Sequence, residues 1–300
     1  MLKNVDAGVL NITFDEAGPS DGWPVILLHG FPYDIHTYDQ VIPILVGQGA
    51  RVITPYLRGF GPTRFLDEAT PRSGQQAAIG HDLLEFINAL QLKSAYLVGY
   101  DWGGRAACIV AALWPERVLG LVSIGAYAIQ DIASAMQPKK PEAEFPYWYQ
   151  YYFHSERGRN ALTENRRALC HLLWQQWSPT WKFSERSFEQ SAQSFDNPDF
   201  VDVVIHSYRH RFGLVQGDPA YAHTEAELAR LPSIQTPTFA LDGADSGFSR
   251  DGTEPHAERF TGHYQHRMIE GAGHNVPQEK PAELAAVIVA LKDYVTGDIQ

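Results

Sequence analysis

Residues 99–104, GYDWGG, follow the apolar run 95–98 and place a carboxylate, Asp101, among small residues. An aspartate is ionised at neutral pH, because its usual pKa is about 3.9, so it can attack an electrophilic carbon without first losing a proton. Attack at a saturated carbon leaves an alkyl ester on Asp101. The same residues also suit a turn in which Asp101 only caps the following helix. The stretch alone leaves both interpretations open.

Apolar runs on either side of this stretch predict the elements that would hold it. Residues 25–30, 51–57 and 118–125 are short, apolar and end near glycine or proline. Apolar residues recur at helical spacing in the segments 77–92 and 281–295. Strands that alternate with helices indicate an α/β fold, with a mostly parallel central sheet flanked by helices on both faces.

Local signals refine these elements. Ser73, followed by Gln76, is a capping-box pattern that predicts the start of the helix. Gly99, Gly103 and Gly104 surround Asp101 with small residues, which a sharp strand-to-helix turn requires. The N–H groups at the start of the next helix favour negative charge at this turn.

The character of the sequence changes near Tyr127. Residues 127–230 are rich in aromatic and polar side chains, as in FPYWYQYYF and VVIHSYRHRFG, and predict helices and loops. A strand pattern returns at TPTFALDGAD, residues 236–245. We therefore expect one core domain made of residues 1–126 and 231–300, interrupted by a helical cap (lid) domain at residues 127–230.

Four motifs together resemble the α/β-hydrolase fold over essentially the whole chain: HGFP at residues 29–32, GYDWGG, DGAD and GAGH. An HGFP loop and an aspartate nucleophile followed by tryptophan resemble the epoxide hydrolases and the related haloalkane dehalogenases. The resemblance implies that Asp101 is the nucleophile, Asp245 the acid and His274 the general base. It also implies an oxyanion hole made by the backbone N–H groups of Phe31 and Trp102. It departs at Tyr56, where many relatives carry an acidic residue, and we interpret Tyr56 as structural.

Asp245 has two rivals for the role of acid. Asp242 lies within the predicted strand end and Asp251 lies far along the loop, so Asp245 is preferred. Some relatives carry the acid after the earlier strand, but that position holds no carboxylate before Asp131. With Asp245 orienting it, His274 would activate the water that attacks the ester carbonyl.

The leaving group distinguishes epoxide hydrolysis from dehalogenation. An epoxide leaves as a basic alkoxide and needs a proton donor, whereas a halide needs only N–H donors around it. Epoxide hydrolases of this fold carry two cap tyrosines, and the matching segments YQYYF and HSYRH imply Tyr149 and Tyr208. The rivals for the first position are Tyr147, Tyr151 and Tyr152.

Other cap residues have both a chemical and a structural interpretation. One of the tryptophans at 148, 174, 177 and 181 could be a second halide donor, although packing of the cap or an apolar pocket is preferred. His206 and His210 have the spacing of metal ligands on a helix, but no third ligand is evident. We therefore favour a solvated helical face for this histidine pair.

Composition excludes several classes of partner. The chain of 300 residues has a formal net charge of −11 and no basic block, which disfavours nucleic acid and anionic membrane surfaces. No signal peptide and no apolar run of about 18–20 residues is evident, so we expect a cytoplasmic protein. Cys108 and Cys170 have no metal-type spacing, and neither a metal nor a cofactor is expected. The expected partner is a small apolar or aromatic substrate, and a homodimer is compatible with the sequence.

The sequence thus predicts hydrolysis of an epoxide to a vicinal diol through an alkyl ester on Asp101. The alternative is a haloalkane or haloacid dehalogenase that uses the same nucleophile. A third hypothesis is a binding protein without catalytic activity that uses the lidded pocket as a receptor.

Overall fold

The computed structural model describes residues 2–125, 127–248 and 254–298. Its central sheet has the strand order β1-β2-β4-β3-β6-β7-β8-β9, and β5 pairs with β2. The strands are β1 (Lys3–Ala7), β2 (Leu10–Ala17), β3 (Trp23–Leu28), β4 (Ala50–Pro55), β5 (Arg64–Phe65), β6 (Ala95–Tyr100), β7 (Val118–Ile124), β8 (Thr238–Gly243) and β9 (Tyr264–Ile269). From β4 to β9 every pairing is parallel, which confirms the predicted α/β architecture.

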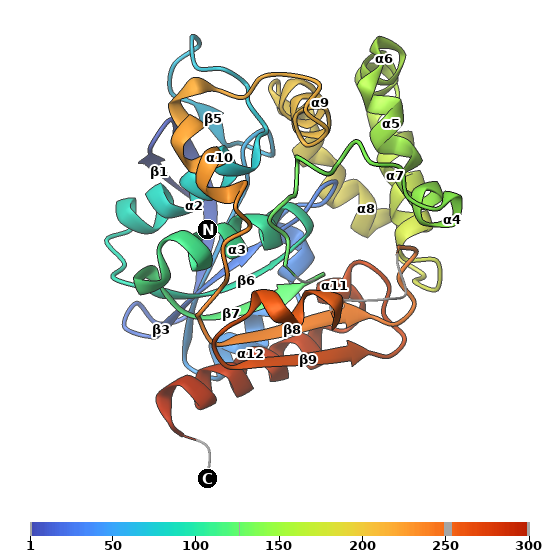
Figure 1. Ribbon diagram of the computed structural model, residues 1–300. Coiled ribbons are helices and arrows are strands. Elements are labelled where there is room, and N and C mark those ends of the chain that lie inside the picture. The colour runs from blue at the N-terminus through green and yellow to red at the C-terminus, as the bar shows by residue number, and fades with distance from the viewer. Residues whose placement is uncertain (1, 126, 249–253, 299–300) are drawn as a thin grey trace.

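Helices cover both faces of this sheet (Figure 1). Helices α2 (Gln76–Ala89) and α3 (Asp101–Leu113) pack on each other, and α1 (Ile42–Gly47) packs on α12 (Pro281–Thr296). The two pairs lie on opposite faces: Cys108 of α3 contacts Ser123 of β7, while Leu291 of α12 lies against Gly120 of the same strand. Residues 120 and 123 point to opposite sides because side chains alternate along a strand.

The chain between β7 and β8 leaves the sheet and forms further helices, drawn from green to orange in Figure 1. The helices are α4 (Pro141–Glu144), α5 (Trp148–His154), α6 (Glu156–Glu164), α7 (Arg166–Trp177), α8 (Glu185–Ala192), α9 (Phe200–His210) and α10 (Ala222–Leu228). Short helical turns occur both in this segment and in the rest of the described chain. They are η1 (Ile35–Tyr38), η2 (Pro115–Arg117), η3 (Phe145–Tyr147), η4 (Gln193–Asp196), η5 (Pro219–Tyr221), η6 (Glu254–Arg259) and α11 (Val276–Glu279). We call the α4–α10 segment the cap. The exact division at residues 126/127 and 230/231 stays a prediction.

Polar contacts fasten the cap to the core. Glu225 of α10 accepts a hydrogen bond from the Ala77 N–H at the start of α2, at 3.0 Å. A carboxylate is favourable there because helix N-termini carry unpaired N–H groups and a partial positive charge. Trp174 of α7 donates its indole N–H to the carbonyl of Pro32, at 2.8 Å. The cap is therefore fixed near both the HGFP loop and α2.

Two local predictions were wrong because contacts distant in sequence determine these positions. The N-cap of α2 is Gln75 and not Ser73, whose hydroxyl instead accepts from the Gln75 N–H at 3.3 Å. Gln76 uses its side-chain oxygen to bind the N–H of Gln130, at 2.9 Å. His206 does not lie on a solvated face: its ring accepts from the N–H of Gly74 and donates to the carbonyl of Gln216.

No helix within the residues that the structure describes has the length and apolar character needed to cross a bilayer.

The turn between β6 and α3 holds Asp101 in the left-handed region, with φ at +52°. That conformation is costly for a residue with a side chain, typically by about 1–3 kcal/mol. Gly103 lets α3 approach β3, because a Cβ there would lie 2.2 Å from the carbonyl oxygen of Leu28. Close packing of the helix on the neighbouring strand therefore enforces the turn.

Replacing Gly103 by alanine is expected to lower the free energy of unfolding by about 1–3 kcal/mol, because the added methyl group would overlap the backbone of β3. Gly47→Ala is the matched control, since a Cβ there meets nothing within 4 Å. Urea denaturation of both variants measures the effect. Equal transition midpoints for the two variants would contradict this account of the turn.

Candidate active site

Two backbone N–H groups hold the Asp101 carboxylate. Its Oδ1 accepts from the N–H of Phe31 at 2.9 Å and from the N–H of Trp102 at 2.7 Å. Phe31 follows β3 and Trp102 is the second residue of α3, so both donors are fixed by the fold. Asp101 itself begins α3, and the N-cap residue is Tyr100 without a side-chain cap bond. Asp101 is therefore not the N-cap residue, although its Oδ1 still accepts from an N–H of the first turn of α3.

His274 faces the other oxygen of the same carboxylate. Its Nε2 lies 4.0 Å from Asp101 Oδ2 and has no hydrogen-bond partner among the described residues. The ring packs against Trp177 and Phe248, with centroid distances of 5.2 and 4.9 Å. Burial lowers the pKa of His274, although the nearby Asp101 charge opposes this effect. A neutral imidazole can accept a proton.

The structure does not join Asp245 to His274. Asp245 follows β8, its N–H donates to the Ala272 carbonyl at 2.8 Å, and its carboxylate accepts from the hydroxyl of Thr180 at 2.9 Å. Within the described residues, the ion pair of His274 is the one with Asp101. The rival Asp242 binds His266 at 2.9 Å, and the rival Asp251 lies outside the described residues. The identity of the acid stays a prediction.

Sequence reasoning missed two residues that hold the turn carrying His274. Ser178, which follows cap helix α7, accepts from the N–H groups of His274 at 3.0 Å and Asn275 at 3.3 Å. Its hydroxyl donates to Glu279 at 2.6 Å. Glu279 in turn accepts from the N–H of Gly273 at 2.7 Å and of Asn275 at 3.0 Å. We call this arrangement the Ser178–Glu279 bracket.

The two predicted tyrosines meet in the cap. Tyr149 of α5 and Tyr208 of α9 are both buried, and their rings pack edge to face with centroids 5.3 Å apart. Gln150 donates to the Tyr149 hydroxyl at 3.0 Å, whereas the Tyr208 hydroxyl makes no hydrogen bond within the described residues. Burial raises the pKa of both phenols above the usual value, so both stay protonated at neutral pH.

The rival tyrosines are placed differently. Tyr151 is exposed and donates to Glu144. Tyr147 lines the same cavity as Asp101, and its ring stacks on Phe248 at 5.3 Å. Tyr152 packs against Trp148. Among the tyrosines, Tyr149 combines full burial with a place on the cavity wall.

A cavity of about 470 Å³ connects these groups and is lined by Asp101, His274, Tyr149, Tyr147 and Phe248, with Arg105 and Arg211 also on its wall. Aromatic rings form much of the surrounding structure, and Phe31 stacks on Trp102 with centroids 5.8 Å apart. The space suits a small organic molecule with an apolar part. The two arginines had no place in the sequence-based hypothesis.

The remaining cap tryptophans divide between packing and the site. Trp174 stacks on Tyr33 at 4.6 Å and on Trp181 at 5.5 Å, and Trp148 donates to Gln176 at 2.9 Å. These contacts support the predicted packing role. Trp177 is different, because its buried indole N–H has no partner within the described residues, and the same holds for Trp102.

Removal of the Ser178 hydroxyl is expected to lower the free energy of unfolding by about 1–3 kcal/mol, because the half-buried Glu279 carboxylate would lose its hydroxyl donor and the N–H groups of His274 and Asn275 would lose one of their two acceptors. Ser178→Ala should also lower kcat with little change in KM, and Ser178→Thr, which keeps a hydroxyl, should restore part of kcat. Urea denaturation and steady-state kinetics measure these effects. Thr163→Ala, on the exposed side of α6, is the control. If Ser178→Ala behaves like this control, the bracket does not position His274.

Comparisons with known proteins identify the family of the chain. Residues 24–281 match the sequence profile of the α/β hydrolase fold family. The chain is 26% identical to epoxide hydrolase A of Mycobacterium tuberculosis, over 98% of this chain and 96% of that protein. It is 34% identical to a haloalkane dehalogenase of Mycobacterium marinum, over 95% and 90% of the two chains. The crystal structure of a candidate epoxide hydrolase from Klebsiella pneumoniae superposes with a TM-score of 0.94 at 45% identity, covering 97% of this chain and 96% of the other.

Proposed function

This chain belongs to the α/β hydrolase fold family and is an epoxide hydrolase-like enzyme, and from that premise we propose that it converts an epoxide to a vicinal diol through an ester on Asp101. The observation that carries the proposal is the arrangement around one carboxylate. Asp101 Oδ1 is held by two N–H groups, and Oδ2 lies 4.0 Å from the Nε2 of His274. Tyr149 lines the same cavity.

In the first step, Asp101 Oδ2 attacks one epoxide carbon and the C–O bond of the ring breaks. The oxygen that leaves becomes an alkoxide, which takes a proton from Tyr149 or Tyr208 because both phenols are buried and protonated. The product of this step is an alkyl ester of Asp101, in which one hydroxyl of the future diol is already formed.

In the second step, neutral His274 takes a proton from water, and the hydroxide attacks the carbonyl carbon of the ester. Negative charge develops on Oδ1, where the N–H groups of Phe31 and Trp102 already point. Collapse breaks the C–O bond of the ester, and His274 returns its proton to the leaving alkoxide. The proton that the regenerated Asp101 carboxyl releases restores the tyrosine. We assign the orientation of His274 to Asp245.

Replacing His274 by alanine is expected to permit the first step and block the second, because no base remains to activate water. After incubation with an epoxide that the parent enzyme hydrolyses, intact-mass analysis should show an added substrate mass, located on the peptide that contains Asp101. His223→Ala, at an exposed histidine, is the control and should turn over without an adduct. Asp101→Asn should give neither turnover nor adduct. Absence of the adduct in the His274 variant would rule out the covalent scheme.

Dehalogenation is the second candidate, because the buried indole N–H groups of Trp102 and Trp177 are without partners in the described part of the chain. Such donors could hold a departing halide, which needs no proton. The 34% identity with a haloalkane dehalogenase also fits this candidate.

A pair of phenylalanine substitutions separates the two reactions. Tyr149→Phe with Tyr208→Phe is expected to reduce epoxide turnover by about 10²–10⁴-fold, because the alkoxide loses its proton donors. Halide release should survive the same change. Diol formation and halide release by purified variants measure the two activities, with Tyr152→Phe as the matched cap control. Epoxide turnover that is unchanged in the double variant would refute the role of the tyrosines.

A further inference from the structure

Arg105 is buried one helical turn after Asp101 on the same face of α3. It is only 7% exposed, and its Nε donates to the carbonyl of Ala128 at 3.3 Å. Its Nη1 has no hydrogen-bond partner within the described residues. A guanidinium has five N–H donors and no means of losing its charge near neutral pH, so an unused nitrogen in a buried position calls for an acceptor from outside the protein.

A second guanidinium adds to this positive charge. Arg211, which follows cap helix α9, lies over the ring of Tyr208 with its Cζ atom 4.3 Å from the centroid. When the Gln130 amide is oriented with its oxygen towards the arginines, that oxygen accepts from Arg211 Nε at 3.0 Å and Arg105 Nη2 at 3.2 Å. Burial and the neighbouring Arg211 lower the pKa of Arg105 to about 10, which still leaves it charged at neutral pH.

Neither arginine forms an ion pair with a carboxylate anywhere in the described residues. The acidic side chains nearby are engaged elsewhere. Asp242 binds His266, Asp131 binds Ser134, and Glu144 accepts from the N–H of Lys139. Asp101 is the one acidic residue of α3, and its Oδ1 already accepts from the N–H groups of Phe31 and Trp102. Two cations thus share a low-dielectric wall with a neutral amide between them.

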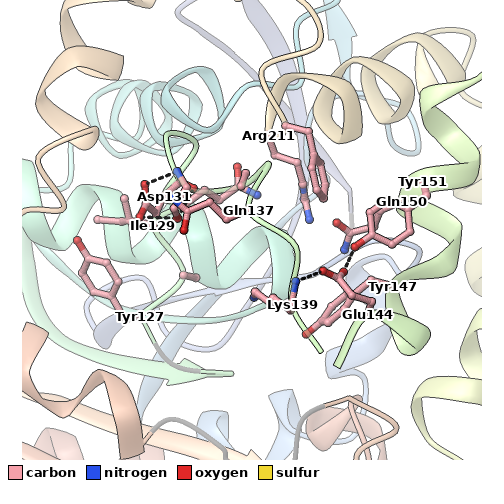
Figure 2. Close-up of a pocket in the computed structure, with 15 residues that line it drawn as sticks. Tyr127, Ile129, Asp131, Gln137, Lys139, Glu144, Tyr147, Gln150, Tyr151 and Arg211 are labelled. Atoms are coloured by element: carbon pink, nitrogen blue, oxygen red, sulfur yellow. Dashed lines mark hydrogen bonds between the residues drawn. The ribbon is translucent and has the colours of Figure 1, made fainter. Parts of the chain in front are cut away.

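Both arginines face the space where a substrate would lie. They line the cavity of about 470 Å³ that also contains Asp101 and His274. Arg211 lines a second cavity of about 410 Å³ as well, which shares Tyr147 and Gln150 with the first. Figure 2 shows Arg211 reaching into this second cavity, with Gln137 and Gln150 on either side of it.

We propose that Arg105 and Arg211 form a subsite for a carboxylate on the substrate, so that the enzyme acts on epoxides of small organic acids. This inference rests on the proposed function. The planar fork of a guanidinium matches a carboxylate, and a buried charged hydrogen bond is among the stronger polar contacts. Residues i and i+4 on a helix are separated by about one turn, so the carboxylate lies only a few atoms from the carbon that Asp101 attacks.

The aromatic side chains of the site determine which uncharged group the substrate carries beside its carboxylate. Phe248, Tyr147 and Tyr149 line the same cavity as the arginines and offer an apolar surface to a ring or short chain. The proposed substrate therefore combines an apolar group with one carboxylate. This narrows the sequence-based expectation of an apolar or aromatic substrate.

A matched pair of substrates tests the subsite: 3-phenyloxirane-2-carboxylate and its neutral carboxamide. The parent enzyme is expected to prefer the acid by at least about tenfold in kcat/KM, and Arg105→Met or Arg211→Met should reduce this preference about 10–100-fold. Arg105→Lys, which keeps a positive charge, should retain part of it. Arg157→Met, at an exposed position of α6, should leave the preference unchanged.

The outcomes separate this inference from the reaction itself. If the parent enzyme hydrolyses both substrates equally, and the ratio does not change in the arginine variants, the subsite is refuted and the proposed function stands. If it hydrolyses neither, the proposed function is contradicted, and calorimetry with unreactive phenylacetate and phenylacetamide decides on the subsite. Tighter binding of phenylacetate that Arg211→Met removes supports the subsite, and equal binding overturns it. If Arg105→Met fails to fold, Arg211→Met and Arg105→Lys decide the question.

Discussion

The Asp101 carboxylate, held by the N–H groups of Phe31 and Trp102, is the interaction on which the rest of the site depends. Both donors are backbone groups, so their directions are fixed by β3 and α3 and cannot adjust to a ligand. The positive φ of Asp101 costs free energy, which the charged hydrogen bonds and the packing of α3 on the sheet offset. A fold that keeps this turn therefore keeps the proposed nucleophile and the two N–H groups of the proposed oxyanion hole in one unit.

The electrostatics of the cavity follow from which groups keep their charge after burial. Burial favours neutral His274 and protonated Tyr149 and Tyr208, which leaves Asp101 as the anion near them. Arg105, Lys139 and Arg211 are cations on the wall of the same cavity, and Arg105 Nη1 has no hydrogen-bond partner within the described residues. Charges that are shielded from bulk water are weakly screened, so a substrate's own charge contributes strongly to its orientation.

Much of this arrangement could be predicted from the sequence, because it depends on local patterns. The parallel strands, the small residues around Asp101 and the helical character of the cap all appear as short-range signals. Contacts between distant segments carried no such signal. Ser178 and Glu279 look like ordinary polar residues in the sequence, and Arg105 looks like a surface arginine in the turn after Trp102. His206 was misjudged for the same reason, and the capping box failed because Gln76 binds the distant Gln130 while Ser73 binds Gln75. The acid that orients His274 stays a prediction.

The Ser178–Glu279 bracket has a consequence for the order in which the molecule is assembled. The His274 turn lies near the C-terminus, and its N–H finds an acceptor on the cap 96 residues earlier in the chain. During synthesis the nucleophile turn and the cap emerge first, and the bracket closes only when Glu279 has left the ribosome. Contacts with such large sequence separation form late and slowly. The bracket is therefore complete only once the segment that carries Glu279 has been synthesised and has packed against the cap.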